Sequence, residues 1–212
     1  MIDILLALAA LWLLCRFLTV CCRVPAALAP LAGLSLAALW LTLAGMAGLL
    51  RPGAAVLYLA CLAGGMVSLK KSRPDSGRTA LHSLITPGST VFWALSLAFA
   101  VYFCIRQPLF ADFDEFSFWG TAAKLTCINN ALYTTGEIGW AWQATQNPGL
   151  IVLGYFFQVW GSFAPWKIFL AYDVLLFACF AAVIGGTRWK NYALAVPAAA
   201  ICWCVPWFFT TY

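Results

Sequence analysis

Long apolar stretches separated by short polar breaks run along most of the chain. A helix needs about 20 mainly apolar residues to cross the roughly 30 Å hydrocarbon layer of a membrane. The strands of a membrane β-barrel alternate apolar and polar residues over about 10 positions, and these stretches do not alternate. The pattern therefore predicts an all-α integral membrane protein with about six transmembrane helices, near residues 2–21, 27–49, 53–69, 89–107, 165–186 and 192–208.

One apolar stretch, residues 147–163, is too short for a regular crossing. Its apolar part, between Pro148 and Gly161, has about 14 residues, whereas a span needs about 20. A full crossing would also carry the basic residues of TRWK (187–190) to the outer face. We therefore expect a half-inserted helix here, in an outer loop that also holds an interfacial helix after an acidic stretch at residues 111–120.

The composition is that of a membrane protein. Hydrophobic residues make up 64% of the 212 positions and charged residues only 9%. Soluble domains carry roughly 25% charged residues. No internal repeat or low-complexity linker divides the chain, so we expect one integral membrane domain over residues 1–212. Residues 1–88 would hold the first helices and a basic loop, and residues 89–212 would begin a helical core.

The positions of the basic residues indicate the orientation of the chain, whose net charge is +5. They lie in short loops and not along one face, so we predict no nucleic-acid partner. Cytoplasmic loops carry an excess of Lys and Arg. We predict a multi-pass protein of the cell membrane that contacts anionic membrane lipids, with residues 70–88 and 187–191 cytoplasmic and residues 108–164 extracytoplasmic.

The amino terminus has Asp3 where a signal peptide would have a basic region. Residues 2–21 are therefore expected to remain as a first helix whose start faces outward. The nine cysteines are scattered, mostly within apolar stretches, and the single histidine, His82, lies in a basic loop. Zinc sites need spaced Cys and His ligands, so we assign no metal site from cysteine.

The stretch ADFDEFSFWG (111–120) holds three of the seven acidic residues. Asp112 is suited to cap a helix whose third position is Glu115, and the aromatic residues around them suit a membrane interface. A carboxylate at the mouth of a low-dielectric cavity can instead act as a general base. Both roles stay open in this one segment, with Asp112 as the cap and Asp114 beside Glu115 facing a substrate cavity.

This outer loop resembles that of the GT-C membrane glycosyltransferases, which use polyprenyl-phosphate-linked sugars. Residues 113–124 read FDEFSFWGTAAK and residues 147–161 read NPGLIVLGYFFQVWG, similar to a bacterial branch that reads roughly DEFSHWG…K…YPPG…GYFF. The resemblance covers about residues 89–208, although Phe118 stands in place of the His and Asn147 falls in the Tyr-Pro-Pro-Gly position. It implies a GT-C-like fold and sugar transfer from a polyprenyl-phosphate donor to an extracytoplasmic cell-envelope acceptor.

The resemblance also implies roles for single residues. Asp114 would be the base that takes the proton of the acceptor hydroxyl, with inversion at the sugar carbon. Glu115 would be a second polar or metal-binding carboxylate, so a divalent metal stays open, although no cofactor is assigned. The candidate substrate-binding residues are Trp119, Lys124, Arg106 and Asn147. Interface anchoring is the alternative for the tryptophan, and snorkelling is the alternative for the two basic side chains.

The GT-C core usually continues beyond this point with further helices and another acidic motif, so we expect a carboxy-terminally truncated member of the family. Two other functions stay open. One is a small transporter or channel subunit, for which Asp173 inside the predicted helix 165–186 is the supporting residue. The other is a non-catalytic membrane scaffold. A structural role for Asp173 would be an interhelical hydrogen bond to Arg106 or a tyrosine. Lys167, at the start of the same predicted helix, would either bind a lipid phosphate or snorkel to the membrane interface.

Overall fold

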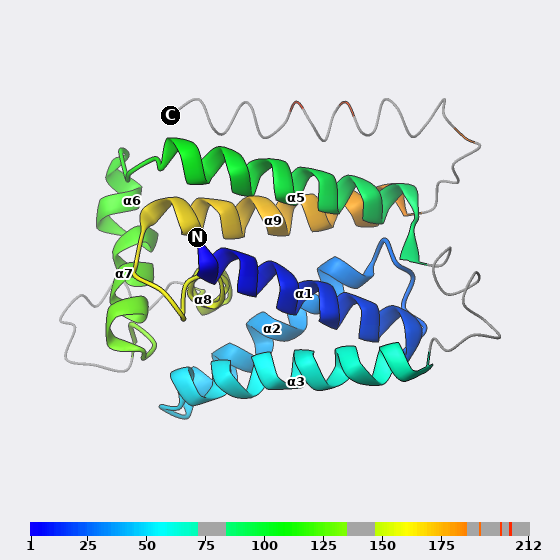
Figure 1. The fold of residues 1–212 in the computed structure, drawn as a ribbon. Helices are drawn as coiled ribbons and strands as arrows, with labels where there is room; N and C mark the ends of the chain where they lie inside the picture. The colour runs from blue at the N-terminus through cyan, green and yellow to red at the C-terminus, as the bar shows by residue number, and fades with distance from the viewer. Residues whose placement is uncertain (72–83, 135–146, 186–190, 192–199, 201–203, 205–212) are drawn as a thin grey trace. The chain divides into compact units, whose positions relative to one another are not determined.

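The computed structural model describes residues 1–71, 84–134, 147–185, 191, 200 and 204 (Figure 1). These residues form helices and connecting turns, and no strand occurs among them. The prediction of an all-α protein is therefore confirmed for this part of the chain. Its helices are α1 (Ile2–Val20), α2 (Ala29–Met46), α3 (Leu50–Lys71), α5 (Pro87–Arg106), α6 (Phe113–Ser117), α7 (Trp119–Asn129), α8 (Pro148–Phe156) and α9 (Pro165–Ile184).

Five of these helices, α1, α2, α3, α5 and α9, are long and apolar enough to cross a membrane. They contain 18 to 22 residues each. At 1.5 Å per residue such helices are about 27–33 Å long, which matches the hydrocarbon layer of a bilayer. The chain therefore has the character of a multi-pass membrane protein. The sixth predicted helix, at 192–208, lies outside the described residues apart from positions 200 and 204.

Two helix bounds differ by three residues from those that hydropathy predicts, more than any other bound. α2 ends at Met46 and not near 49, because the chain turns at Gly48, whose φ of 72° is a conformation that favours glycine. α3 begins at Leu50 and not at 53, so Pro52 lies inside its first turn. A proline is tolerated there because the first N–H groups of a helix have no intrahelical partner.

Three shorter helices complete the described fold. α6 has 5 residues, α7 has 11 and α8 has 9. α7 packs against both α6 and α8. Nine helical residues rise by about 13.5 Å, less than half of a bilayer. This length agrees with the prediction that residues 147–163 do not form a spanning helix, while the depth of α8 in a membrane stays a prediction.

The chain divides into two compact units. Unit 1 comprises Met1–Ala9, Ser35–Ala60 and Ala100–Tyr172, and unit 2 comprises Ala10–Leu34, Cys61–Phe99 and Asp173–Tyr212. Each of the five long helices contributes residues to both units. All of α6, α7 and α8 belongs to unit 1, so unit 1 also contains every candidate site residue named from the GT-C resemblance.

Within unit 2, two adjacent glycines allow α3 to approach α1 closely. A Cβ atom on Gly65 would lie 2.5 Å from Cδ2 of Leu13. One turn along α3, the Oγ of Ser68 accepts a hydrogen bond of 3.2 Å from Nε of Arg16. Small residues allow close backbone approach between membrane helices, where packing largely replaces the hydrophobic effect as the driving force.

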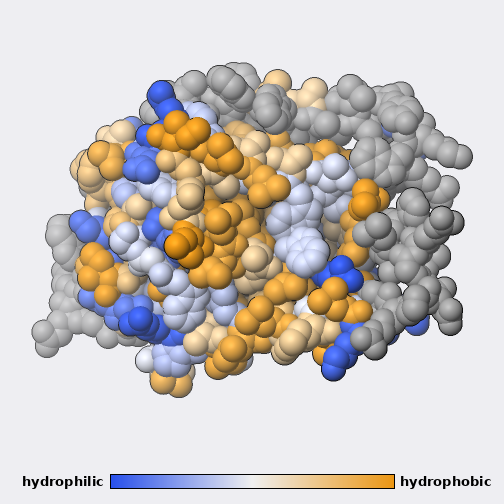
Figure 2. Space-filling model, viewed as in Figure 1, coloured by the Kyte–Doolittle hydropathy of each residue, from blue (hydrophilic) through white to orange (hydrophobic). Residues whose placement is uncertain are grey.

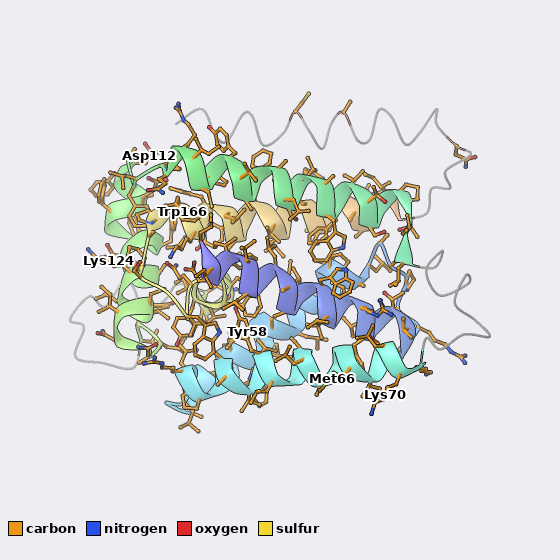
Figure 3. The ribbon with its side chains drawn as sticks, viewed as in Figure 1. Tyr58, Met66, Lys70, Asp112, Lys124 and Trp166 are labelled. Carbon is orange, nitrogen blue, oxygen red and sulfur yellow. The ribbon has the colours of Figure 1, made fainter. Side chains whose placement is uncertain are left out.

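Large apolar side chains are exposed along the long helices. On α3, Leu59 is 64% exposed and Met66 is 60% exposed, and Figure 3 shows Met66 on the outer side of its helix. Figure 2 shows apolar side chains over much of the visible face of the molecule. Soluble proteins rarely expose such extensive apolar surface, whereas lipid chains cover it without penalty. This surface supports the membrane character that the helix lengths indicate.

Candidate functional site around Asp114

The N-terminus of α6 is organised by its acidic residues. Asp112 is the N-cap, with extended backbone angles, and Glu115 occupies the third helical position. Oε2 of Glu115 accepts backbone hydrogen bonds from Ala111 at 2.5 Å and from Asp112 at 3.1 Å. The Asp112 side chain faces the N–H of Glu115 and completes the capping box. One oxygen of Glu115 is therefore committed to the backbone.

Asp114 differs from its two acidic neighbours. Its side chain is exposed on α6 and makes no hydrogen bond or ion pair with any described residue. Glu115, by contrast, is only partly exposed. Asp112 is equally exposed but takes part in the capping box, so Asp114 is the carboxylate of this stretch that has neither a capping role nor a described partner. It is chemically the most available of the three for a proton or a substrate.

The connection between α6 and α7 is short and tight. Phe118 both ends α6 and precedes α7, and its N–H donates to the carbonyl oxygen of Asp114 at 2.9 Å. The hydroxyl of Thr121 donates across the connection to the carbonyl oxygen of Phe116. Gly120 is buried, and a Cβ atom there would overlap with the carbonyl oxygen of Glu115. The backbone that carries Asp114 is therefore held from the α7 side.

An aromatic cluster centred on Phe110 lies next to this connection. The Phe110 ring makes edge contacts with Phe116 and Trp119, at centroid distances of 6.2 and 5.5 Å. Trp119 also contacts Phe169 at 5.8 Å and Tyr172 at 5.4 Å. The half-buried Trp119 ring thus packs between α7 and the start of α9, and Figure 1 shows these helices next to each other. Stacking of this ring on a sugar stays a prediction.

The two candidate phosphate contacts are both exposed. Lys124 lies on α7, and Figure 3 shows it on the side of that helix directed away from α9. Arg106 is the last residue of α5. Neither side chain makes a hydrogen bond or ion pair with the described residues, so both cations are available to an anionic group. Both lie within ten sequence positions of Asp114, and all three residues belong to unit 1.

Asn147 begins α8. Its side-chain oxygen accepts a hydrogen bond of 2.9 Å from the N–H of Gly149, and Pro148 follows at the first helical position. Asn at the N-cap and Pro at the next position are a favourable pair at a helix start. The structure therefore gives Asn147 a capping function, and its assignment as a substrate-binding residue stays a prediction.

A partly buried hydrogen bond joins α7 to α8. Asn130 adopts a left-handed conformation (φ 52°) at the end of α7, and its side-chain oxygen accepts a 2.8 Å hydrogen bond from the hydroxyl of Tyr155. Burial raises the pKa of the Tyr155 hydroxyl above its ordinary value and raises the pKa of the Cys127 thiol to about 12. Both groups are consequently neutral at physiological pH. On the α3 side, the Tyr58 hydroxyl donates to the carbonyl oxygen of Phe156 at 2.8 Å, and Figure 3 shows Tyr58 directed toward α8.

A buried ion pair near the start of α9 is the feature that sequence reasoning missed. Nζ of Lys167 lies 2.5 Å from Oδ2 of Asp3, and both side chains are about 5% exposed or less. The same ammonium donates to the carbonyl oxygen of Ser162 at 2.6 Å. Lys167 therefore neither snorkels nor is available to a lipid phosphate. The sequence carried one signal of this pair. Asp3 and Lys167 each lie near the start of a predicted apolar helix, and both helix starts are predicted to face outward.

Asp173 lies within α9, in unit 2. Its Oδ2 is buried and has no hydrogen-bond partner among the described residues. The expected interhelical hydrogen bond is therefore not made by this oxygen. An aspartate at the centre of a membrane helix costs about 2.5–3.5 kcal/mol on insertion scales. None of the described residues offsets this cost at Oδ2.

No group of three or more His, Cys, Asp and Glu side chains is placed to hold a metal ion in the described part of the chain. At the acidic stretch only Glu115 and Asp114 are adjacent, and Glu115 already bonds to the backbone. The chain matches no protein-family model, no curated protein and no solved structure. Its function therefore has to be inferred from the residues described above.

Proposed function

We propose that this chain is a membrane glycosyltransferase of the GT-C type, or a part of one. It would move a sugar from a polyprenyl-phosphate donor to an acceptor hydroxyl of the cell envelope, on the extracytoplasmic side. The observation that supports this most is the difference between the acidic residues of α6. Asp112 and Glu115 organise the helix start, whereas the Asp114 carboxylate is exposed and without a described partner.

The transfer reaction needs a general base for the acceptor hydroxyl and few other groups from the protein. Asp114 takes the proton of the acceptor hydroxyl, and the hydroxyl oxygen forms a bond to the anomeric carbon. The bond from that carbon to the phosphate oxygen breaks at the same time, and its electron pair leaves with the polyprenyl phosphate. Attack opposite the leaving group inverts the sugar carbon. Because the leaving group is already a phosphate, the catalyst chiefly needs an activated nucleophile and a cation near the departing charge.

Lys124 and Arg106 are the proposed cations. Both are exposed in unit 1, and neither has to break an ion pair with a described residue before it binds a phosphate. Trp119 would stack on the sugar while it packs against α9. Asn147 would act through α8, whose start it caps. These assignments form one hypothesis with the assignment of Asp114 as the base.

The test is transfer of labelled sugar from polyprenyl-phosphate donors in membranes that carry the full-length gene. Asp114→Asn is expected to abolish transfer at a normal protein level. Asp112→Asn is the matched control, since it removes the same charge two positions away and Asn caps helices as well as Asp. Undiminished transfer by Asp114→Asn would exclude it as the base and would reduce the stretch to a capped helix of a non-catalytic scaffold.

Glu115→Gln separates the two roles of the neighbouring residue. Gln at the third helical position can still accept the capping hydrogen bonds that Glu115 accepts from Ala111 and Asp112. If Glu115 only caps α6, transfer by this variant stays near the wild-type rate. A loss of transfer that extra divalent metal partly restores would instead assign Glu115 to a metal ion.

A small transporter is the second candidate, and Asp173 is the observation that favours it. A carboxylate oxygen that is buried without a described partner inside a membrane helix is a common feature of ion pathways. Proton uptake by proteoliposomes, followed with an enclosed pH-sensitive dye, would test it. Uptake that Asp173→Asn abolishes and Asp114→Asn leaves intact would favour transport over glycosyl transfer.

A further inference from the structure

At Gly120, α7 lies directly against the backbone of α6. The residue is buried, and a Cβ atom at this position would lie 2.9 Å from Cε2 and Cζ of Phe110. It would also overlap with the carbonyl oxygen of Glu115, which follows Asp114 directly. A ring at the end of a side chain can move aside, but a helix carbonyl moves only with its helix. Any residue other than glycine must therefore shift α6 and α7 relative to each other.

Two hydrogen bonds hold the same segment. The carbonyl oxygen of Asp114 accepts from the N–H of Phe118 at 2.9 Å, and the carbonyl oxygen of Phe116 accepts from the hydroxyl of Thr121. With five residues, α6 is too short to be stable alone, because isolated helices shorter than about 12 residues are marginal in water. The contacts to α7 therefore determine where the backbone of Asp114 lies.

We propose that Gly120 and Thr121 are positioning residues that hold the Asp114 carboxylate where it can take the proton of the acceptor hydroxyl. Gly120 does so by leaving room for the Glu115 carbonyl, and Thr121 by bonding to Phe116. This inference rests on the proposed function, since the place of Asp114 matters for catalysis only if Asp114 is the base. It predicts a kinetic defect from a residue that touches neither donor nor acceptor.

Gly120→Ala in the full-length protein is the first test, measured as sugar transfer with donor and acceptor concentrations varied separately. The kcat is expected to fall on the order of 100-fold with both KM values unchanged, because a misplacement of about 1 Å at the reacting centre has effects of that size. Gly33→Ala is the matched control. Its new Cβ would meet side chains of Leu11 and Leu14 no closer than 3.4 Å, an ordinary contact.

A double-mutant comparison separates positioning from general damage. Asp114→Glu already displaces the carboxylate, so Gly120→Ala added to it should lower kcat far less than it does in the wild type. Equal effects in the two backgrounds would show that Gly120 acts independently of Asp114 and would overturn the inference. If Gly120→Ala does not accumulate in membranes, Thr121→Val takes its place, with a smaller expected fall in kcat.

The outcomes distinguish this inference from the proposed function. If Asp114→Asn is inactive while both Gly120→Ala and Thr121→Val keep kcat within twofold of wild type, the base is correct and the positioning residues are wrong. If Asp114→Asn transfers sugar normally, or the wild type transfers none, the proposed function fails and this inference fails with it. The proposed function and this inference are both supported if Asp114→Asn is inactive and kcat falls in Gly120→Ala and Thr121→Val but not in Gly33→Ala.

Discussion

Nζ of Lys167, near the start of α9, lies 2.5 Å from Oδ2 of Asp3, near the start of α1. The two residues are 164 positions apart in the chain, and both belong to unit 1. The amino group of Met1 lies 3.0 Å from the other Asp3 oxygen, and the Ser162 carbonyl accepts from Lys167. The pair is thus buried and hydrogen-bonded, which is the arrangement in which a charge pair is tolerated in a low-dielectric interior.

Removing one member of this pair should destabilise the fold more than removing both. Lys167→Met leaves the buried Asp3 carboxylate with only the exposed amino group of Met1 as an ionic partner. Loss of one member of a buried pair costs about 3–5 kcal/mol. The double variant Asp3→Leu with Lys167→Met should recover most of that loss, because apolar groups of similar size need no partner. The measurement is the free energy of unfolding in detergent. A double variant as unstable as Lys167→Met would contradict this account.

Gly161→Ala should weaken the same pair. A Cβ atom at Gly161 would lie 2.8 Å from Cγ of Asp3 and closer still to its Oδ2, so the carboxylate must move away from Lys167. Overpacking of this kind costs about 1–3 kcal/mol. Gly154→Ala in α8 is the control, since its Cβ would meet Ile168 at an ordinary 3.4 Å. Thermal unfolding should separate the two variants, and equal transition temperatures would argue against the predicted crowding.

Asn147→Ala should destabilise α8 by about 1 kcal/mol, because it removes the side-chain oxygen that accepts from the N–H of Gly149. Asn147→Asp should not, since Asp is an equally good N-cap. The comparison also bears on the role inferred from the GT-C resemblance. If Asn147→Asp is as stable as the wild type but loses sugar transfer, the residue contacts substrate in addition to capping the helix.

Cys127 should resist alkylation in the folded protein. Burial raises the pKa of its thiol from 9.0 to about 12, and the thiolate is the reactive form. At pH 8 the thiolate fraction is therefore far smaller than that of an ordinary thiol. Cys22 is exposed just after α1 and serves as the internal reference. Iodoacetamide at pH 8 followed by mass spectrometry should modify Cys22 first, and equal rates would refute the prediction.

The long helices could be predicted from the sequence because length and apolar content decide whether a helix can span a membrane. Five of the six predicted helices are present with bounds within a few residues, and the sixth falls outside the described residues. The spacing of Asp112 and Glu115 also predicted the capped start of α6. Both predictions use local information, in which a few neighbouring residues determine the outcome.

Contacts between distant segments could not be predicted in the same way. Nothing in the local pattern pairs Asp3 with Lys167, because each residue looks like an ordinary charge at a helix end. The contact of Gly120 with the Glu115 carbonyl likewise depends on the angle between α6 and α7. Such features follow from how the helices pack, and a single sequence does not contain that information in a local form.

The separation of Asp3 and Lys167 also has a consequence for the order in which the protein is made. At about 5–20 residues per second, a ribosome needs roughly 10–30 s to advance from one residue to the other. During that interval α1 carries a carboxylate whose ammonium partner has not yet been synthesised. The first helix therefore has to keep its acidic end in contact with water, and it can settle into its final position only after α9 has emerged. Insertion of this chain should accordingly end with a late docking step that joins its first and last described spans.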